Sequence, residues 1–326
     1  MCTAVTYQKS HFYFGRTLDY DVDFDEEVVI TPRSFPLPFR HRRKPDNHYA
    51  IIGMAKVAEN YPLYFDAVNE KGLAMAGLNF PGNAHYFPAQ NDGQDIASFE
   101  LIPYILGSCA SVSQAKQALS GIRITDTAFH PELPPSPLHW LIADRSGCIA
   151  VESTMDGLRI YDNPVGVLTN NPTFPQQLER LIDYLHISPN EPKNLLCPSL
   201  ELHPYSRGMG AMGLPGDLSS PSRFVRAAFT KLNSLSENTE EACISQFFHI
   251  LDAVSQAKGC CRLGDDRQEY TLYSSCCSCD HGIYYYSTYE NRSITAVSLF
   301  DADLNSSELI PYPLIKALSI YHQDCQ

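Results

Sequence analysis

Cys2 directly follows the initiator methionine, and this position gives it a chemistry that an internal cysteine lacks. If Met1 is removed, Cys2 carries both a thiol and a free α-amino group. Because an α-amine has an ordinary pKa of roughly 7.7–8.0, it can act as a base at neutral pH. The position therefore predicts a nucleophilic thiol that is activated by the amine of its own residue. The alternative is a small structural cysteine in an N-terminal strand.

Two charged residues follow at a spacing that could serve such a nucleophile. The chain turns back after a short "KS" connection, and Arg16 lies on the returning segment. A cation there could lower the pKa of the thiol. Asp19 could accept a hydrogen bond from the amine and orient it. The alternative is an ordinary surface Arg–Asp pair.

Asparagines at the ends of two predicted strands could supply an oxyanion hole. Asn79 precedes a Pro-Gly turn, and Asn170 precedes Asn171-Pro172. An Asn side-chain N–H, or a backbone N–H beside it, can stabilise the negative charge that develops during acyl transfer. The alternative is that both are turn residues. Arg223 stands at the entry of a predicted helix, where it could order the nucleophile or bind an anion, or simply be ion-paired.

Two further motifs suggest a nucleotide site and a metal site, but the sequence around them supports neither. The segment "GMGAMG" (208–213) matches the dinucleotide fingerprint, but it neither follows a strand nor opens a helix, so a flexible loop is expected. Cys276, Cys277 and Cys279 form a cluster, but no second pair stands at zinc-finger spacing and no H-E-x-x-H motif is present. We expect no metal site.

The strands and helices that must position these residues follow one another along the chain in groups of strands and groups of helices. Strands are predicted at 3–8, 12–18, 27–31, 49–54, 73–78, 138–143, 149–153, 165–169, 270–274, 283–288 and 294–299. Helices are predicted at 97–109, 111–119, 174–186, 222–235 and 238–259. Antiparallel-looking strand groups with helices in blocks predict an α+β fold rather than a doubly wound one. No linker divides the chain, so a single domain over residues 2–326 is expected.

Composition limits the partners. With 326 residues of which 44% are hydrophobic, the chain can bury a large core. Its net charge of −13 disfavours nucleic acid and anionic membranes. The one basic cluster, at 39–45, is interpreted as a solvated loop. No signal peptide or membrane span is visible, and the 11 cysteines predict free thiols in a reduced, cytoplasmic protein.

Together these motifs resemble the choloylglycine hydrolase family, which contains bile salt hydrolases and penicillin V acylases of the N-terminal nucleophile superfamily. The resemblance spans essentially the whole chain and rests on "MCT", "FGRTLD", "NEKGLAMAGLNFPG", "LHW", "GVLTNNPTF", "GLPGDLSSPSRFVR", "FFHIL" and "GIYYYSTYENRSITAV". It implies a four-layer αββα sandwich, commonly assembled as a homotetramer, with no cofactor and no metal.

The resemblance also implies roles for the residues singled out above. Cys2 matches the nucleophile, and the matching catalytic set is Cys2, Arg16, Asp19, Asn79, Asn170 and Arg223. An Asn at position 79 resembles bile salt hydrolases, whereas penicillin V acylases often carry Tyr there. The implied reaction is cleavage of the amide bond between a bile acid and glycine or taurine. The alternatives are a penicillin V acylase, an acyl-homoserine lactone acylase, or a ligand-binding or thiol-rich structural protein, which would not need all six residues.

A steroid would need an apolar pocket with few polar groups. The candidate lining residues are Leu18, Tyr20, Phe65 and Phe129, with further candidates at 52–54 and 61–65. The conjugated bile salt ends in a carboxylate or a sulfonate, so the acidic protein needs a local cation for it. Ser206 and Arg207, in the glycine-rich loop, are the expected head-group contacts and predict a lean toward taurine conjugates. The alternative is that Arg207 is a solvated loop residue.

Overall fold

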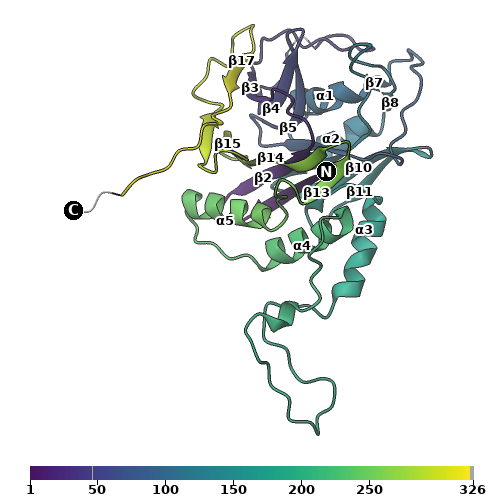
Figure 1. The fold of residues 1–326 in the computed structure, drawn as a ribbon. Helices are drawn as coiled ribbons and strands as arrows, with labels where there is room; N and C mark the ends of the chain where they lie inside the picture. The colour runs from purple at the N-terminus through teal and green to yellow at the C-terminus, as the bar shows by residue number, and fades with distance from the viewer. Residues whose placement is uncertain (46, 324–326) are drawn as a thin grey trace.

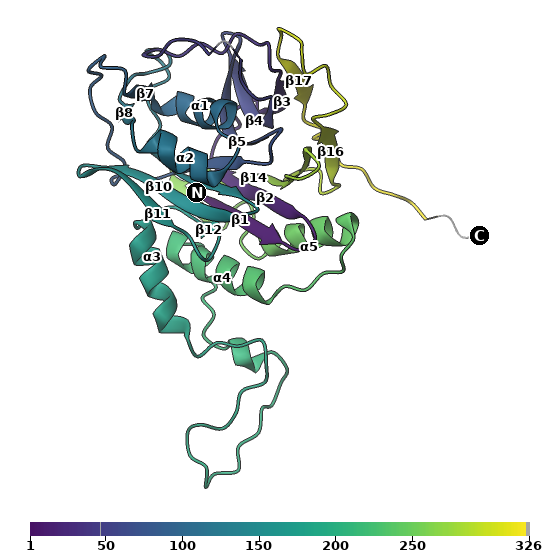
Figure 2. The same cartoon turned by 180° about the vertical axis from the view of Figure 1, so that it is seen from behind.

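Two antiparallel sheets lie face to face between layers of helices (Figures 1 and 2). The predicted αββα arrangement is therefore confirmed. The computed structural model describes residues 1–45 and 47–323. Because both faces of each sheet are covered, the central strands are buried on both sides, as β2 shows over Phe12–Asp19.

The first sheet contains the N-terminus. In spatial order its strands are β12 (Val167–Leu168), β1 (Cys2–Gln8), β2 (Phe12–Tyr20), β14 (Arg267–Ser278), β15 (Ile283–Thr288) and β16 (Thr295–Ser298), with β13 (Cys261–Gly264) beside β14. The first residues of the chain thus form an inner strand, with hydrogen-bonded neighbours on both sides. This placement gives the chain start a rigid surrounding that a terminus ordinarily lacks.

The second sheet is built mainly from the first half of the chain. Its order is β11 (Gly157–Asp162), β10 (Gly147–Thr154), β9 (Leu138–Asp144), β6 (Ala74–Asn79), β5 (Tyr61–Asn69), β4 (Ile51–Ala58), β3 (Glu27–Thr31) and β17 (Ile310–Pro313). A small parallel pair, β7 (Asp95–Ala97) and β8 (Arg123–Thr125), lies apart from it. Each sheet contains strands from both ends of the chain, so the two sheets are not separate sequence units.

Helices cover the outer faces. On the second sheet, α1 (Leu101–Ser108) packs on β5 and β6, and α2 (Val112–Leu119) packs on β9 and β10. On the first sheet, α4 (Ser220–Asn233) packs on β1, and α5 (Glu240–Asp252) packs on β14. The remaining helical elements are α3 (Phe174–Arg180), η1 (Ser98–Glu100), η2 (Leu181–Tyr184) and η3 (Met209–Ala211). None of the helices in the described residues combines the length and apolar composition of a transmembrane span.

Local sequence explains where these helices begin and end. The side chain of Thr239 accepts a hydrogen bond from the Ala242 N–H, and Glu240 adds negative charge in the first turn of α5. The predicted helix 238–259 is nevertheless too long, since α5 ends at Asp252. Beyond it, the Gln256 N–H donates to Thr271 Oγ1 at 2.8 Å, so contact with β14 replaces further helix.

Every predicted strand overlaps an observed one, but the sequence reasoning missed β5 and β11 as well as short strands at the edges. β5 carries Pro62 and Asp66, which are both unusual in a strand. Pro62 stands near the hairpin end, and Asp66 is buried. The Asp66 carboxylate accepts hydrogen bonds of 2.6 Å from both Tyr273 and Tyr284, so partners on the other sheet make this strand possible.

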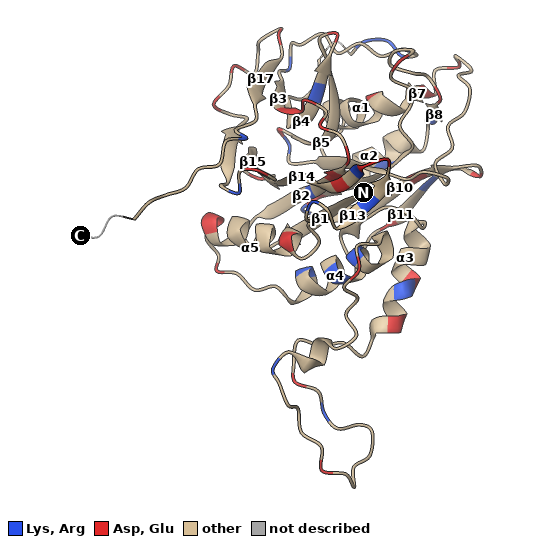
Figure 3. Ribbon diagram, viewed as in Figure 1, with Lys and Arg blue, Asp and Glu red and all other residues tan. Residues whose placement is uncertain are grey.

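The basic segment (residues 39–45) forms neither helix nor strand, as expected, and Arg40, Arg43 and Lys44 are exposed to solvent, but Arg40 and Arg42 also contact other loops. Arg40 Nη2 donates to the carbonyl oxygen of Phe129 at 2.9 Å. Arg42 Nε donates to the carbonyl oxygen of Asp95 at 3.0 Å. Both arginines therefore fasten neighbouring loops. Elsewhere, basic and acidic residues are interspersed over most elements of the described chain (Figure 3).

Substitution of Gly15 tests the packing of the first sheet, because β2 and β14 approach closely at this residue. An added Cβ would lie 1.9 Å from the Ser275 carbonyl oxygen and 2.9 Å from the Cys276 Cα. Both atoms belong to the backbone, so they cannot swing aside. We expect Gly15→Ala to lower the free energy of unfolding by about 3 kcal/mol or more, or to prevent folding.

Urea denaturation followed by circular dichroism measures this effect. Gly147→Ala is the matched control, because a Cβ there meets nothing within 4 Å. Its free energy of unfolding should stay within about 0.5 kcal/mol of the parent. Equal midpoints for the two variants would show that the sheet adjusts at Gly15.

Candidate active site

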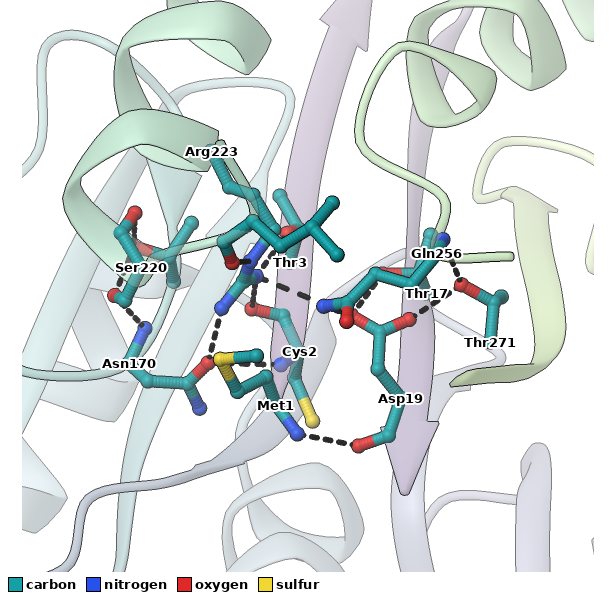
Figure 4. Close-up of polar contacts among 12 residues, drawn as sticks. Met1, Cys2, Thr3, Thr17, Asp19, Asn170, Ser220, Arg223, Gln256 and Thr271 are labelled. Atoms are coloured by element: carbon teal, nitrogen blue, oxygen red, sulfur yellow. Dashed lines mark hydrogen bonds and ion pairs between the residues drawn. The ribbon is translucent and has the colours of Figure 1, made fainter. Parts of the chain in front are cut away.

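The main chain of Cys2 is held by hydrogen bonds from two other elements (Figure 4). Its N–H donates to Asn170 Oδ1 at 2.8 Å, and its carbonyl oxygen accepts a hydrogen bond from Arg223 Nη1 at 2.5 Å. Cys2 also pairs with Leu18 across β1 and β2. The residue is only 3% exposed, yet it lines a cavity. The thiol is thus fixed in place and can meet a ligand.

Asn170 connects three elements at the end of β12. Its Nδ2 donates to the carbonyl oxygen of Asn79 at 2.7 Å, and its backbone N–H donates to Ser220 Oγ at 2.8 Å. Its Oδ1 accepts from Arg223 Nη2 at 2.7 Å as well as from Cys2. The structure therefore orients the Asn170 side-chain oxygen toward the Cys2 nitrogen. One N–H of the amide group is left for another acceptor.

Asp19 lies on the helix-covered face of β2. Because side chains alternate along a strand, Asp19 and Thr17 face one way, whereas Arg16 and Leu18 face the other. Thr271 Oγ1 and Gln256 Nε2 donate to the Asp19 carboxylate at 2.6 and 3.2 Å. Arg223 Nη1 lies 4.0 Å from Asp19 Oδ2. Gln256 and Thr271 were not singled out from the sequence, because nothing local marks them as partners of Asp19.

Arg16 is completely buried on the opposite face of β2 and lines the cavity with Cys2. Its Nη1 donates to the carbonyl oxygens of Gly77 and Phe65 at 2.5 and 3.2 Å. Its Nη2 has no partner within the described residues. Burial by itself lowers the pKa of Arg16, but the net shift is upward because Cys2 and Asp66 favour its charge. Arg16 thus places a permanent cation and an unused donor beside the thiol.

The chain terminus itself occupies the site. The Met1 amine donates to the Asp19 carbonyl oxygen at 2.5 Å and to the carboxylate of Glu269. The Asp19 N–H donates back to the Met1 carbonyl oxygen at 2.8 Å. Burial lowers the pKa of this amine, and Cys2 and Asp19 oppose part of that shift. Glu269 is a further polar partner that the sequence reasoning missed.

The cavity that Cys2 lines is mostly apolar and encloses about 210 Å³. All four predicted lining residues border it together with Cys2: Leu18, Tyr20, Phe65 and Phe129. The sequence reasoning missed Phe24, Phe99, Leu133, Pro134, Pro135 and Leu138 as well as the polar Lys56, Ser98 and Ser136. Of the broader candidates, Leu63 and Tyr64 line it, whereas 52–54 do not. The set combines a cysteine sulfur with space for a large apolar group.

Ser206 and Arg207 do not belong to this cavity. Both are exposed in a long loop that follows α3 and extends away from the sheets, shown in teal and green in Figure 1. Ser206 Oγ donates only to the backbone oxygen of Arg207. The expected contact with a substrate head group therefore finds no support within one chain. Glycines make this loop permissive, but nothing in the sequence shows which way it extends.

The cysteine cluster lies in and just after β14, and the glycine motif lies in the loop before α4. Burial raises the pKa of the Cys276 and Cys277 thiols well above the ordinary range, which disfavours their thiolate forms. The cysteines of residues 1–45 and 47–323 are all free, and Cys325 lies outside the described residues. Within those ranges no group of three or more His, Cys, Asp or Glu could hold a metal. The segment 208–213 contains only the short η3.

Solved structures resemble the whole chain. The C2A mutant of the conjugated bile acid hydrolase from Clostridium perfringens has a TM-score of 0.91 and 33% identity, over 99% of this chain and 100% of that one. A penicillin V acylase from Agrobacterium tumefaciens has a TM-score of 0.76 at 20% identity, over 96% of this chain and 91% of that one. The second likeness indicates a shared fold.

Sequence comparisons agree. The bile salt hydrolase/transferase of Lactiplantibacillus plantarum is 54% identical over 98% of this chain and 99% of its own length. The conjugated bile acid hydrolase of Lactobacillus acidophilus is 35% identical over 96% of this chain and 100% of its own length. The penicillin V acylase of Pectobacterium atrosepticum is 28% identical over 50% of this chain and 39% of its own. Residues 2–312 match the model of the linear amide C–N hydrolases, so the chain belongs to the choloylglycine hydrolase family.

Proposed function

We propose that this chain hydrolyses the amide bond of glycine- and taurine-conjugated bile acids, with the thiol of an N-terminal Cys2 as nucleophile. The observation that carries the proposal is the cavity, in which Cys2 and Arg16 border an apolar space of about 210 Å³. A fused steroid ring system suits such a space, since ligand pockets are mainly apolar with a few placed polar groups. Full-length relatives named as bile salt hydrolases support the same substrate class.

The first chemical step is attack of the Cys2 sulfur on the amide carbonyl. Arg16 stabilises the thiolate through its charge. The carbonyl oxygen becomes an oxyanion, which needs donors aimed at it. Asn170 Nδ2, after its bond to the Asn79 carbonyl oxygen, has one N–H left for this oxyanion. The Asn79 side chain lines the cavity and can add a second donor.

The Cys2 amine moves the protons. Without Met1, the nitrogen that now donates to Asn170 Oδ1 becomes the α-amine. It takes the thiol proton and passes a proton to the leaving nitrogen of glycine or taurine as the C–N bond breaks. Water then attacks the thioester, loses its proton to the same amine, and releases the bile acid while the thiol is regenerated. Asp19 and Arg223 keep the amine and the Cys2 main chain in place.

The direct test is product analysis with a mixed pool of conjugated bile salts. Mass spectrometry should detect free bile acids together with glycine and taurine. Phenoxymethylpenicillin and an acyl-homoserine lactone, offered separately, should be turned over less efficiently, as the identities of the bile salt hydrolase and penicillin V acylase relatives indicate. Penicillin turnover without bile-salt turnover would overturn the proposed substrate.

Assembly into a homotetramer and a cytoplasmic location complete the proposal. The loop after α3 exposes a series of large apolar side chains, which monomeric proteins rarely leave together in water. They are Leu195, Leu196, Leu200, Leu202 and Tyr205. Contact with other copies of this chain would bury them. The free cysteines agree with a reducing compartment.

The mature enzyme is expected to begin at Cys2. In the described chain the terminal amine belongs to Met1 and is bound by Asp19 and Glu269, so the Cys2 nitrogen is an amide and cannot act as a base. Intact-mass spectrometry of active protein should show the loss of one methionine. Full activity in a preparation that retains Met1 throughout would contradict the mechanism.

Replacing the nucleophile should abolish hydrolysis while preserving the fold. Cys2→Ala should be inactive, and Cys2→Ser should be far weaker than the parent, because a hydroxyl is a poorer nucleophile than a thiol. Iodoacetamide should inactivate the enzyme through Cys2. Cys197 is a demanding control, since a hydrogen bond from Ser199 lowers the pKa of its solvent-accessible thiol.

We expect Cys197 to be alkylated without loss of activity, and Cys197→Ser to remain as sensitive to iodoacetamide as the parent. Peptide mapping identifies the modified residue at each stage of inactivation. If inactivation instead followed modification of Cys276, Cys277 or Cys279, the assignment of Cys2 would fail.

Asn170→Ala should reduce kcat by about 10²–10³-fold, the usual effect of losing an oxyanion donor. It also removes the acceptor for the Cys2 nitrogen. Asn171→Ala is the matched control, because its side chain donates to the Pro81 carbonyl oxygen rather than contacting Cys2. Steady-state kinetics on one conjugate compare the two. A raised KM with unchanged kcat in Asn170→Ala would mean that Asn170 only binds substrate.

A further inference from the structure

One wall of the cavity is a loop with little internal support. Residues 126–137 connect β8 to β9 without helix or extended strand, and they include prolines 131, 134, 135 and 137. Phe129 is the one buried residue of this loop, at 9% exposure, and it lines the cavity. The position of the Phe129 ring therefore sets the width of the cavity on this side.

Phe129 packs in a small aromatic group outside the main cores. Its ring centroid lies 5.3 Å from that of Phe99 and 5.9 Å from that of Tyr61. Phe99 also lines the cavity. Such contacts favour burial of the ring, but they do not fix the backbone of the loop that carries it. A separate anchor is required for that backbone.

Arg40 supplies the anchor from the basic segment. Its Nη2 donates to the Phe129 carbonyl oxygen at 2.9 Å, and its guanidinium carbon lies 5.6 Å from the Phe129 ring centroid and 6.0 Å from that of Phe99. The backbone N–H of Arg40 donates to the buried Glu100 carboxylate at 2.6 Å. One arginine thus ties both the backbone and the ring of Phe129 to a fixed point.

A second, weaker tie lies beside the first. His41 Nε2 is 2.7 Å from Thr127 Oγ1, so the next residue of the basic segment contacts the same loop two residues before Phe129. Arg42 makes the same kinds of contact as Arg40, to backbone carbonyl oxygens and an aromatic ring, but with a different loop. It donates to the carbonyl oxygens of Asp95 and Gln94, and its guanidinium carbon lies 4.9 Å from the Tyr104 ring centroid. Arg42 does not line the cavity.

We propose that Arg40 is a positioning residue that selects substrates by holding the Phe129 wall. A rigid fused ring system gains affinity from a cavity of fixed width, because it cannot adapt its own shape. A linear acyl chain can follow a wall that moves. Arg40 therefore favours polycyclic acyl groups over flexible ones. This inference rests on the proposed function, since it places the acyl part of the substrate in the cavity.

The test compares Arg40→Met with Arg42→Met on two substrates that share the glycine head group. Glycodeoxycholate carries a rigid acyl group, and N-decanoylglycine carries a flexible one. For Arg40→Met we expect kcat/KM on glycodeoxycholate to fall by about tenfold, mainly through KM, with kcat within about twofold. For N-decanoylglycine, kcat/KM should change by less than about twofold. Arg42→Met should leave both values unchanged.

Limited proteolysis provides a readout that does not depend on activity. Chymotrypsin can cut after Phe129 only when the ring leaves its pocket, whereas Tyr205 is 83% exposed and serves as an internal reference in each sample. Cleavage at Phe129 relative to Tyr205 should increase in Arg40→Met but not in Arg42→Met. Thr127→Val, which removes the second tie and keeps Arg40, should show a smaller increase.

The possible outcomes test the role of Arg40 and the proposed bile-salt hydrolysis separately. If Arg40→Met and Arg42→Met match in selectivity and in cleavage at Phe129, contacts other than Arg40 hold the wall and the inference fails. If the parent cleaves neither glycodeoxycholate nor taurine conjugates, the proposed function fails, while the cleavage at Phe129 still tests the anchor. An equal loss of kcat/KM on both substrates would make Arg40 a general support of the fold and overturn its role in selection.

Discussion

The hydrogen bonds to the main chain of Cys2 are the constraint on which the rest of the site depends. A chain end ordinarily frays, and a nucleophile placed there would sample many positions. Here Asn170 holds the nitrogen of Cys2 and Arg223 holds its carbonyl oxygen. A hydrogen bond from a charged group such as Arg223 contributes about 1.5–3 kcal/mol and a neutral one about 0.5–1.5 kcal/mol, so the two together can outweigh the loss of freedom of one residue. The thiol consequently keeps one position relative to the cavity.

This constraint explains why the site is distributed over both faces of the first sheet. Arg16 and the thiol serve the cavity between the sheets, while Asp19 and Arg223 lie toward the helices. Both arginines are fully buried, and each has a carboxylate nearby: Asp66 for Arg16 and Asp19 for Arg223. Uncompensated buried charges would be strongly destabilising, so the carboxylates are required by the fold. The placement of these two arginines and the packing of the sandwich therefore depend on each other.

Most of the site and cavity residues predicted from the sequence lie in strands or just after one; the exceptions are Arg223 in α4 and Phe129 in the loop 126–137. Strand pairing then brings Cys2, Leu18 and Tyr20 to fixed relative positions. The family resemblance supplied what spacing could not, namely that Asn79, Asn170 and Arg223 meet at the same point. Sequence reasoning could not supply the contacts that join segments far apart in the chain. Ser206 and Arg207 lie in a loop whose direction no local pattern encodes, and the arginines of the basic segment have partners more than 50 residues away.

The electrostatics around the terminal nitrogen show how the site can hold a base in a cluster of charges. Burial and the neighbouring Arg223 both lower the pKa of the amine of Met1, whereas Asp19 raises it. Removing Met1 shifts the amine one residue deeper, to the nitrogen that already faces Asn170 Oδ1. That oxygen also accepts a hydrogen bond from Arg223. In the proposed mechanism, the arginine that fixes the Cys2 main chain therefore also orients the acceptor that faces its amine.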